Sequence, residues 1–277
     1  MRSLGIHVRL SSSLDDACAY VKQLNITALQ MFVRSEPSRT LIHPSAAACR
    51  RFAHFLEEHI AHAYVHASYL INPARDVPLH DHVVFTREMA LAQQLGFHAI
   101  ILHPGSPGAG KSRMFGIDSL ARFINQARIR YPSMKLILEN VAFKEPSIGG
   151  DLQDFYLLLG KVDDPDALAF CIDTAHAHAY GYDLSTAHNR QNFIDHSAAM
   201  IGIQRIALLH INDTQEARGS CIDRHSFLEQ GVIGCDVLRA FALHKELAHI
   251  PLIAELPASD LDYQRQVVQK LYAWHQL

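Results

Sequence analysis

Residues 171–176 read Cys-Ile-Asp-Thr-Ala-His, an apolar run that passes directly into side chains able to bind metal. Five other apolar runs end in the same manner, on His66, His103, Glu139, His210 and Glu255. A buried strand has no structural reason to end on an unpaired carboxylate or imidazole, because removing either group from water costs free energy. These endings therefore predict a polar centre assembled at one end of a barrel.

Eight short apolar runs alternate with segments of helical period along the chain. The runs cover residues 4–8, 28–32, 63–65, 99–102, 136–138, 169–172, 206–209 and 252–254. They lack the apolar and polar alternation of half-buried strands, which is typical of parallel strands covered on both faces. This repetition of strand and helix predicts an α/β fold, a (β/α)8 TIM barrel, with residues 1–277 as a single domain. A doubly wound open sheet is less favoured.

Residues typical of helix caps predict where two helices end or begin. Gly96 follows a stretch of helical period that begins near Val83, and it predicts the end of that helix. Ser259 and Asp262 have the spacing of a capping box, which predicts the start of the final helix.

The composition favours a protein with one large apolar core and little general affinity for nucleic acid. The chain has 277 residues, 49% of them apolar, enough for one barrel of roughly 250 residues. Its formal net charge of −3 argues against strong non-specific binding of nucleic acid, although ions bound in a local groove would add positive charge. Five cysteines without a CxxC pair predict a reducing compartment and a cytoplasmic protein. No apolar segment is long enough to predict a membrane span.

The strand-end side chains should surround one cavity, since the carboxyl ends of barrel strands converge on a single rim. Three further candidates follow nearby: His176 after the sixth run, and Asp223 with His225 after the seventh. Nine nitrogen and oxygen ligands exceed the need of one ion and suit two or three. The lack of cysteine ligands favours a catalytic site, and these ligand types admit zinc, manganese or iron. His7 and His178 also lie near the expected rim, without a partner that requires them.

The motifs resemble, in order and spacing, the endonuclease IV family of apurinic/apyrimidinic endonucleases. The resemblance extends from Gly5 to Glu255 and therefore covers nearly the whole chain. The matching segments are GIHV at 5–8, HASYLIN at 66–72, HPGS at 103–106, EN at 139–140, CIDTAH at 171–176, HIND at 210–213, DRH at 223–225 and Glu255.

The resemblance implies a TIM barrel that holds three zinc ions, for which manganese is an acceptable substitute. The ligand groups would be His66, His103 and Glu139 for the first ion, Glu139, Asp173, His210 and Glu255 for the second, and His176, Asp223 and His225 for the third. Glu139 and Glu255 would be the catalytic residues, because they would do most to place the attacking water.

The resemblance further implies a monomeric DNA-repair enzyme whose partner is double-stranded DNA with abasic sites. It would hydrolyse the phosphodiester 5′ to such a site, with removal of blocked 3′ ends as a further activity. The expected DNA contacts are Tyr69, Arg34 and Arg39. Residues 32–39 read FVRSEPSR, where the family carries a Lys-Asn-x-Arg-Gln-Trp-like stretch, so the loop that holds DNA departs from the family pattern.

Two alternatives remain open. The first is a divalent-metal sugar isomerase or epimerase of the xylose-isomerase-like barrels, which would use one or two ions. The third ligand group, His176, Asp223 and His225, argues against it. The second is a protein that binds DNA or metal without turnover. Metal stoichiometry would separate the nuclease from the isomerase, and strand cleavage would separate it from the binding protein.

Overall fold

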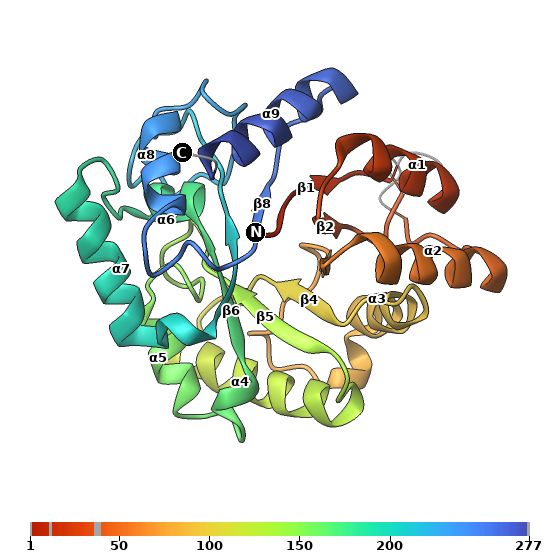
Figure 1. The fold of residues 1–277 in the computed structure, drawn as a ribbon. Coiled ribbons are helices and arrows are strands. Elements are labelled where there is room, and N and C mark those ends of the chain that lie inside the picture. Colours follow the sequence, from red (N-terminus) through yellow and green to blue (C-terminus); the bar gives the residue numbers. More distant parts are fainter. Residues whose placement is uncertain (1, 11–12, 36–39, 276–277) are drawn as a thin grey trace.

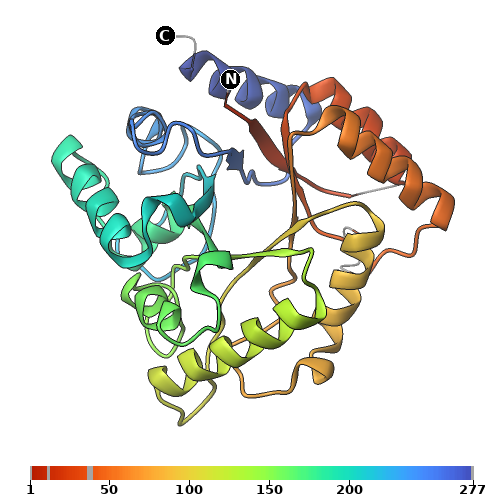
Figure 2. The same ribbon diagram turned by 60° about the horizontal axis from the view of Figure 1, so that its bottom comes forward.

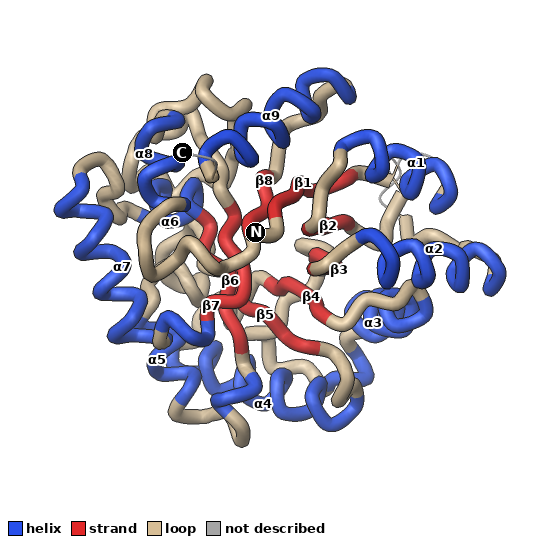
Figure 3. Tube along the Cα trace, in the orientation of Figure 1, coloured by secondary structure: helices blue, strands red, loops and turns tan. Residues whose placement is uncertain are grey.

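The computed structural model of the chain describes residues 2–10, 13–35 and 40–275. Within them, parallel strands form a closed barrel in which each strand pairs with its neighbours in sequence and β1 pairs with β8 (Figures 1 and 3). The strands are β1 (Leu4–Val8), β2 (Ala28–Met31), β3 (His62–His66), β4 (Ala99–Leu102), β5 (Lys135–Glu139), β6 (Ala169–Asp173), β7 (Ile206–His210) and β8 (Leu252–Ala254). The predicted TIM barrel is confirmed, and each predicted run matches a strand to within one residue at either end.

Helices surround the barrel on its outer face (Figure 2). They are α1 (Leu14–Leu24), α2 (Ala46–His59), α3 (Val83–Gln94), α4 (Arg113–Arg130), α5 (Gln153–Leu159), α6 (Thr174–Tyr180), α7 (Ala187–Ile201), α8 (Cys235–Ala242) and α9 (Leu261–Trp274), with short 3-10 turns at Leu79–Asp81, Pro165–Ala167 and Ile203–Arg205. Among the described helices, none combines the length and the apolar character needed to cross a membrane.

Of the two predicted helix ends, the one at Gly96 is confirmed and the one at Ser259 is wrong. Gly96 has a φ of +82° two residues after the end of α3, as expected of a glycine that terminates a helix. The predicted capping box at Ser259 is wrong. The N-cap of α9 is Asp260, whose carboxylate accepts a hydrogen bond from the backbone N–H of Tyr263 at 2.8 Å. A carboxylate at this position also complements the positive end of the helix dipole.

The apolar core has two layers. The larger layer fills the space between the barrel and its helices. The smaller layer lies inside the barrel and consists of Ala28, Tyr64, Ala99, Ile101, Ile137, Ala169, Cys171, Leu208 and Ile253.

The inner layer explains where the strand-end side chains point. Ile101 precedes His103 by two residues, and Ile137 precedes Glu139 in the same way. Alternate residues of a strand face the same side, so an interior apolar residue directs the side chain two positions later to the interior as well. Since this end of each strand is the carboxyl end, the side chains meet above the inner layer at one mouth of the barrel.

Candidate metal centre

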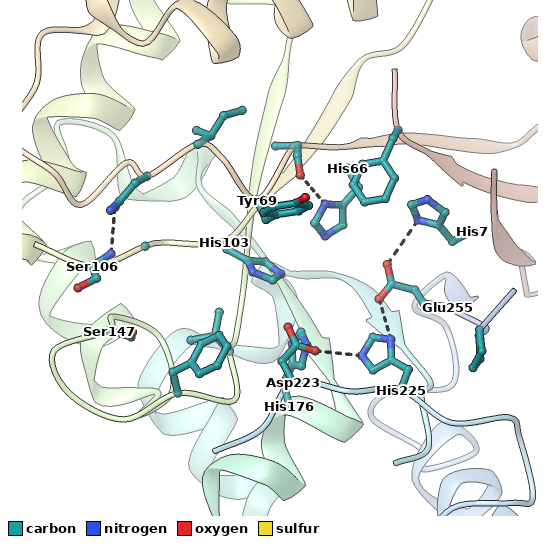
Figure 4. Close-up of a pocket in the computed structure, with 18 of the residues that line it drawn as sticks. His7, His66, Tyr69, His103, Ser106, Ser147, His176, Asp223, His225 and Glu255 are labelled. Atoms are coloured by element: carbon teal, nitrogen blue, oxygen red, sulfur yellow. Dashed lines mark hydrogen bonds and ion pairs between the residues drawn. The ribbon is translucent and has the colours of Figure 1, made fainter. Parts of the chain in front are cut away.

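A cavity of about 640 Å³ opens at this mouth of the barrel (Figure 4). Six of the predicted ligands line it: His66, His103, His176, Asp223, His225 and Glu255. The other three, Glu139, Asp173 and His210, are completely buried and come from the ends of β5, β6 and β7. The structure therefore brings all nine predicted side chains to one place, and the binding of metal by them stays a prediction.

The first ligand group gathers around one oxygen of Glu139. The Nε2 atoms of His66 and His103 lie 3.1 Å and 3.2 Å from Glu139 Oε2. The other ring nitrogen of His66, Nδ1, lies 2.8 Å from the backbone oxygen of Ala67, to which it can donate a hydrogen bond. Such a bond leaves Nε2 unprotonated and able to bind a metal ion.

The second ligand group gathers around the other oxygen of Glu139. His210 Nδ1 lies 2.8 Å from Glu139 Oε1, 3.5 Å from Glu255 Oε2 and 3.8 Å from Asp173 Oδ2. One nitrogen thus faces three carboxylates. Because Glu139 gives Oε2 to the first group and Oε1 to the second, its carboxylate has the position expected of a bridging ligand.

The third ligand group lies next to the second. His176 Nε2 is 3.1 Å from Asp223 Oδ1, and His225 Nε2 is 3.9 Å from the same oxygen. Asp173 also approaches this group, with Oδ2 3.5 Å from His225 Nε2. His176 Nε2 is buried and makes no hydrogen bond despite its short contact with Asp223. Close donor atoms without hydrogen-bond geometry are expected of two ligands that share one cation.

The charges of the cluster also suit cations. Burial disfavours the charged forms of Glu139 and Glu255, but the surrounding imidazoles outweigh it and hold the pKa of both carboxyls well below the usual range. Burial likewise opposes protonation of His176 and His210, yet the neighbouring acidic groups raise the pKa of both rings well above the ordinary value. The carboxylates therefore stay ionised, and the cluster favours positive charge, whether as protons on the imidazoles or as bound cations.

Gln30 supports the cluster, and no role was predicted for it from the sequence. This buried side chain from β2 donates from Nε2 to Glu255 Oε1 at 2.5 Å and accepts at Oε1 from His210 Nε2 at 2.7 Å. Donation to Gln30 leaves His210 Nδ1 without a proton, as a metal ligand requires. The sequence signal for this role was a polar residue in an apolar strand, two positions after Ala28 and therefore on the same inward face of β2.

His7 extends this network. Gln30 Nε2 also lies 2.8 Å from His7 Nδ1, which therefore accepts a hydrogen bond and leaves the proton on Nε2. His7 lines the cavity, and its Nδ1 lies 3.5 Å from Glu255 Oε1. The structure thus supplies the partners that the sequence did not reveal for His7. His178 is half-buried and is not among the residues that line this cavity.

Two asparagines next to ligands were part of the recognised motifs but had no assigned role. Asn212 accepts from the backbone N–H of Glu255 at 2.7 Å and donates to Asp173 Oδ2 at 2.5 Å. Asn140 accepts from the backbone N–H of Asp173 at 2.7 Å. Both side chains tie the ends of neighbouring strands together, which fixes the carboxylates that those strands carry.

The residues predicted to contact DNA differ in how exposed their side chains are. Tyr69 lies at the cavity rim and is 60% exposed, so its ring is accessible to a large ligand. The Arg34 side chain is only 16% exposed and pairs with Glu88. Arg39 lies outside the described residues. Contact of these three residues with nucleic acid stays a prediction.

Comparison with known proteins identifies the family. Residues 18–275 match the model of the xylose isomerase-like TIM barrels. The chain is 30% identical over 261 residues to a "Probable endonuclease 4" of Campylobacter concisus, with 92% of each chain covered. It is 32% identical over 213 residues to "Apurinic-apyrimidinic endonuclease 1" of Saccharomyces cerevisiae, covering 76% of this chain and 57% of the yeast protein.

A solved structure agrees with these sequence matches. The crystal structure of endonuclease IV from Thermus thermophilus superimposes with a TM-score of 0.83 at 24% identity, covering 99% of each chain. At this identity the likeness establishes the fold, whereas the match to the Campylobacter protein over most of both chains establishes the family. The chain belongs to the endonuclease IV family of apurinic/apyrimidinic endonucleases, within the xylose isomerase-like TIM barrels.

Proposed function

We propose that the protein is a zinc-dependent endonuclease that hydrolyses the phosphodiester 5′ to an abasic site in double-stranded DNA during base-excision repair. Three zinc ions, or manganese in their place, would occupy the three ligand groups, and removal of blocked 3′ ends would be a second activity. The protein would act as a monomer in the cytoplasm. The observation that carries the proposal is the bridging position of Glu139 between two ligand groups, beside a third group in one open cavity.

The donor set fits these ions. Five imidazoles and four carboxylates are the ligand types of catalytic zinc sites, and His66 and His210 hold their second ring nitrogen in a hydrogen-bonding contact. When bound, the ions would supply positive charge beside the scissile phosphate and lower the pKa of a coordinated water.

Glu255 is the carboxylate best placed to orient the attacking water. It lines the cavity, whereas Glu139 is completely buried beneath it. Glu255 Oε2 lies 3.5 Å from His210 Nδ1 and 3.7 Å from His225 Nδ1, between the second and third ligand groups. Gln30 and Asn212 hold its two oxygens, so the carboxylate meets the substrate in a fixed orientation.

Glu139 has the complementary task of holding the first two ligand groups together. Tyr69 would contact the duplex at the rim next to the cavity. A volume of about 640 Å³ admits a sugar-phosphate unit that lacks its base. An extruded abasic nucleotide would therefore bring its phosphate to the metal centre while the duplex stays outside.

Incision of a duplex oligonucleotide with one tetrahydrofuran abasic analogue tests the proposal. The zinc-loaded wild type should cut 5′ to the analogue, and Glu255→Gln should lower the rate by more than roughly a hundredfold. Glu57→Gln, which changes an exposed glutamate on α2, is the matched control and should cut like the wild type.

An intact strand with fully metal-loaded wild type would contradict the nuclease. If the protein then bound one or two ions and converted small sugars, it would be an isomerase or epimerase, the other kind of enzyme compatible with this barrel family. If it retained abasic DNA without cutting it, it would be a binding protein. The third ligand group favours the nuclease, because an isomerase has no use for it.

A further inference from the structure

Glu88 is a buried acid on α3, outside the ligand groups, and it has no part in the chemistry proposed above. It is 1% exposed. Its Oε1 accepts a hydrogen bond from Arg34 Nε at 2.5 Å, and its Oε2 accepts one from the backbone N–H of Ser68 at 3.0 Å. Arg34 lies in the loop after β2, and Ser68 lies in the loop after β3. One carboxylate therefore connects two loops at the carboxyl end of the barrel.

Arg34 forms the base of the first loop. It makes an antiparallel bridge with Leu41, and the backbone N–H of Ser35 donates to Thr40 at 2.9 Å. The chain thus leaves and returns at Arg34, so the contact with Glu88 holds the base of this loop in place.

Ser68 begins the turn in the second loop. The backbone N–H of Ile71 donates to the Ser68 backbone oxygen at 2.9 Å, and that of Leu70 lies 3.3 Å from Ser68 Oγ. This turn presents Tyr69 and Leu70, which are 60% and 62% exposed. Tyr69 lines the metal cavity, whereas Leu70 and Arg34 line a neighbouring groove. The turn therefore forms a ridge between the two hollows.

Joining two loops by a buried ion pair costs free energy, because both charges are removed from water. Burial raises the pKa of Glu88, although Ser68 and Arg34 both favour its charged form. Apolar side chains of similar volume would often stabilise the fold as well or better. The ion pair instead fixes how the two loops lie relative to each other, because each carboxylate oxygen of Glu88 binds a different loop.

We infer that Glu88 is a positioning residue that fixes the loop base at Arg34 relative to the Tyr69–Leu70 turn, so that both loops meet the same stretch of DNA. The inference rests on the proposed nuclease function. It also changes the expected role of Arg34, which acts through Glu88 on loop position instead of binding a phosphate.

A double-mutant cycle tests this coupling. Steady-state KM and kcat are measured on the tetrahydrofuran duplex for the wild type, Glu88→Gln, Arg34→Gln and the double variant. Each single change should raise KM roughly tenfold and leave kcat within about twofold. The reason is that the loops bind the duplex equally strongly in the ground state and in the transition state. The double variant should be no worse than the poorer single variant, since both changes break the same Arg34–Glu88 contact. The zinc content should equal that of the wild type.

Asp154→Asn is the matched control. Asp154 is also 1% exposed, pairs with Arg113 and accepts from the backbone N–H of Gly149 at 2.8 Å, but it holds the loop after β5. Combined with Arg34→Gln, its effect on KM should be additive, because the two pairs share no partner. The control thus separates loop coupling from a general loss of a buried ion pair.

The dependence of KM on salt provides a second measurement that needs Arg34→Gln alone, should Glu88→Gln fail to fold. A positioning role leaves the slope of log KM against log salt unchanged. Loss of a phosphate contact would lower the slope by about one.

Three results would overturn the inference while the nuclease stands: additive effects in the cycle, a shallower salt slope for Arg34→Gln, or a Glu88→Gln variant with wild-type KM. A wild type that neither cuts nor binds the duplex would overturn the proposed function, and the inference with it.

Discussion

Glu139 is the side chain on which the proposed metal centre would depend most. It is completely buried at the end of β5, and its two oxygens face different ligand groups, with His66 and His103 on one side and His210 on the other. Glu139 owes its position to the end of β5, and its partners come from the ends of β3, β4 and β7.

Replacing Glu139 by Gln should release zinc from the first two ligand groups. The amide keeps the shape but loses the charge that balances two cations, so we expect about one ion per chain and a fall in incision of more than roughly a hundredfold. Metal analysis and the incision assay measure both quantities. Three retained ions would show that Glu139 is not the bridge.

Gln30→Leu should weaken metal binding without disturbing the fold. The leucine removes the hydrogen bonds that orient His210 and Glu255 and also frees His7, and changes to such supporting residues cost roughly 10- to 100-fold in metal affinity. A competition titration with a zinc chelator measures the affinity. Gln269→Leu on the exposed side of α9 is the control, and equal affinities in the two variants would rule out the orienting role.

At the scale of the elements, the loop from 214 to 233 presents the third ligand group. It carries Asp223 and His225, and Asp213 holds its two ends together. The carboxylate of Asp213 accepts from the backbone N–H groups of Thr214 at 2.9 Å and Ile233 at 3.1 Å. A single buried side chain therefore closes the loop that contributes two of the three ligands in this group.

Asp213→Ala should remove the third ion selectively. The two ends of the loop are then no longer held together, whereas the first two ligand groups come from strand ends and keep their places. We therefore expect two ions per chain, against the three proposed for the wild type. Native mass spectrometry counts the ions. Asp213→Asn, which retains an acceptor oxygen, should keep the third ion; loss of all three ions in the alanine variant would contradict the independence of the groups.

The elements were largely predictable because buried parallel strands are continuous apolar runs and the ligands mark their ends. Residues 99–102 and 252–254 match β4 and β8 without any shift. The contacts of Glu88 with Arg34 and Ser68 were not predictable, since they join segments separated in sequence and no local pattern relates them. The role of Gln30 was not predicted for a similar reason, because its partners His210 and Glu255 lie at the ends of β7 and β8, far from it in sequence. The N-cap at Asp260 was missed because Ser259 offered an equally plausible cap one residue earlier.

At the scale of the whole molecule, the proposed metal centre lies outside the apolar core of the barrel. The larger apolar layer lies outside the barrel and the inner layer lies beneath the ligands. In the absence of ions, ion pairs between carboxylates and protonated imidazoles balance the cluster, as the raised pKa of His210 and the lowered pKa of Glu255 show.

Removal of metal by a chelator should therefore abolish incision but leave the barrel folded. Zinc at about a thousand times its Kd should add about 4 kcal/mol to the free energy of unfolding, so the chelated protein should melt several degrees lower in a single transition. Circular dichroism follows the melting. Unfolding at room temperature on chelation would show that the ions are part of the core.

The order of the ligands along the chain has a consequence for synthesis on the ribosome. The first ligand is His66, and the last is Glu255, which follows β8, the strand that pairs with both β7 and β1. The second ligand group is thus incomplete in every nascent chain that has not reached β8. Until the final strand emerges and closes the ring, the growing polypeptide lacks the complete set of proposed ligands, so the proposed cleaving activity would arise only together with the finished fold.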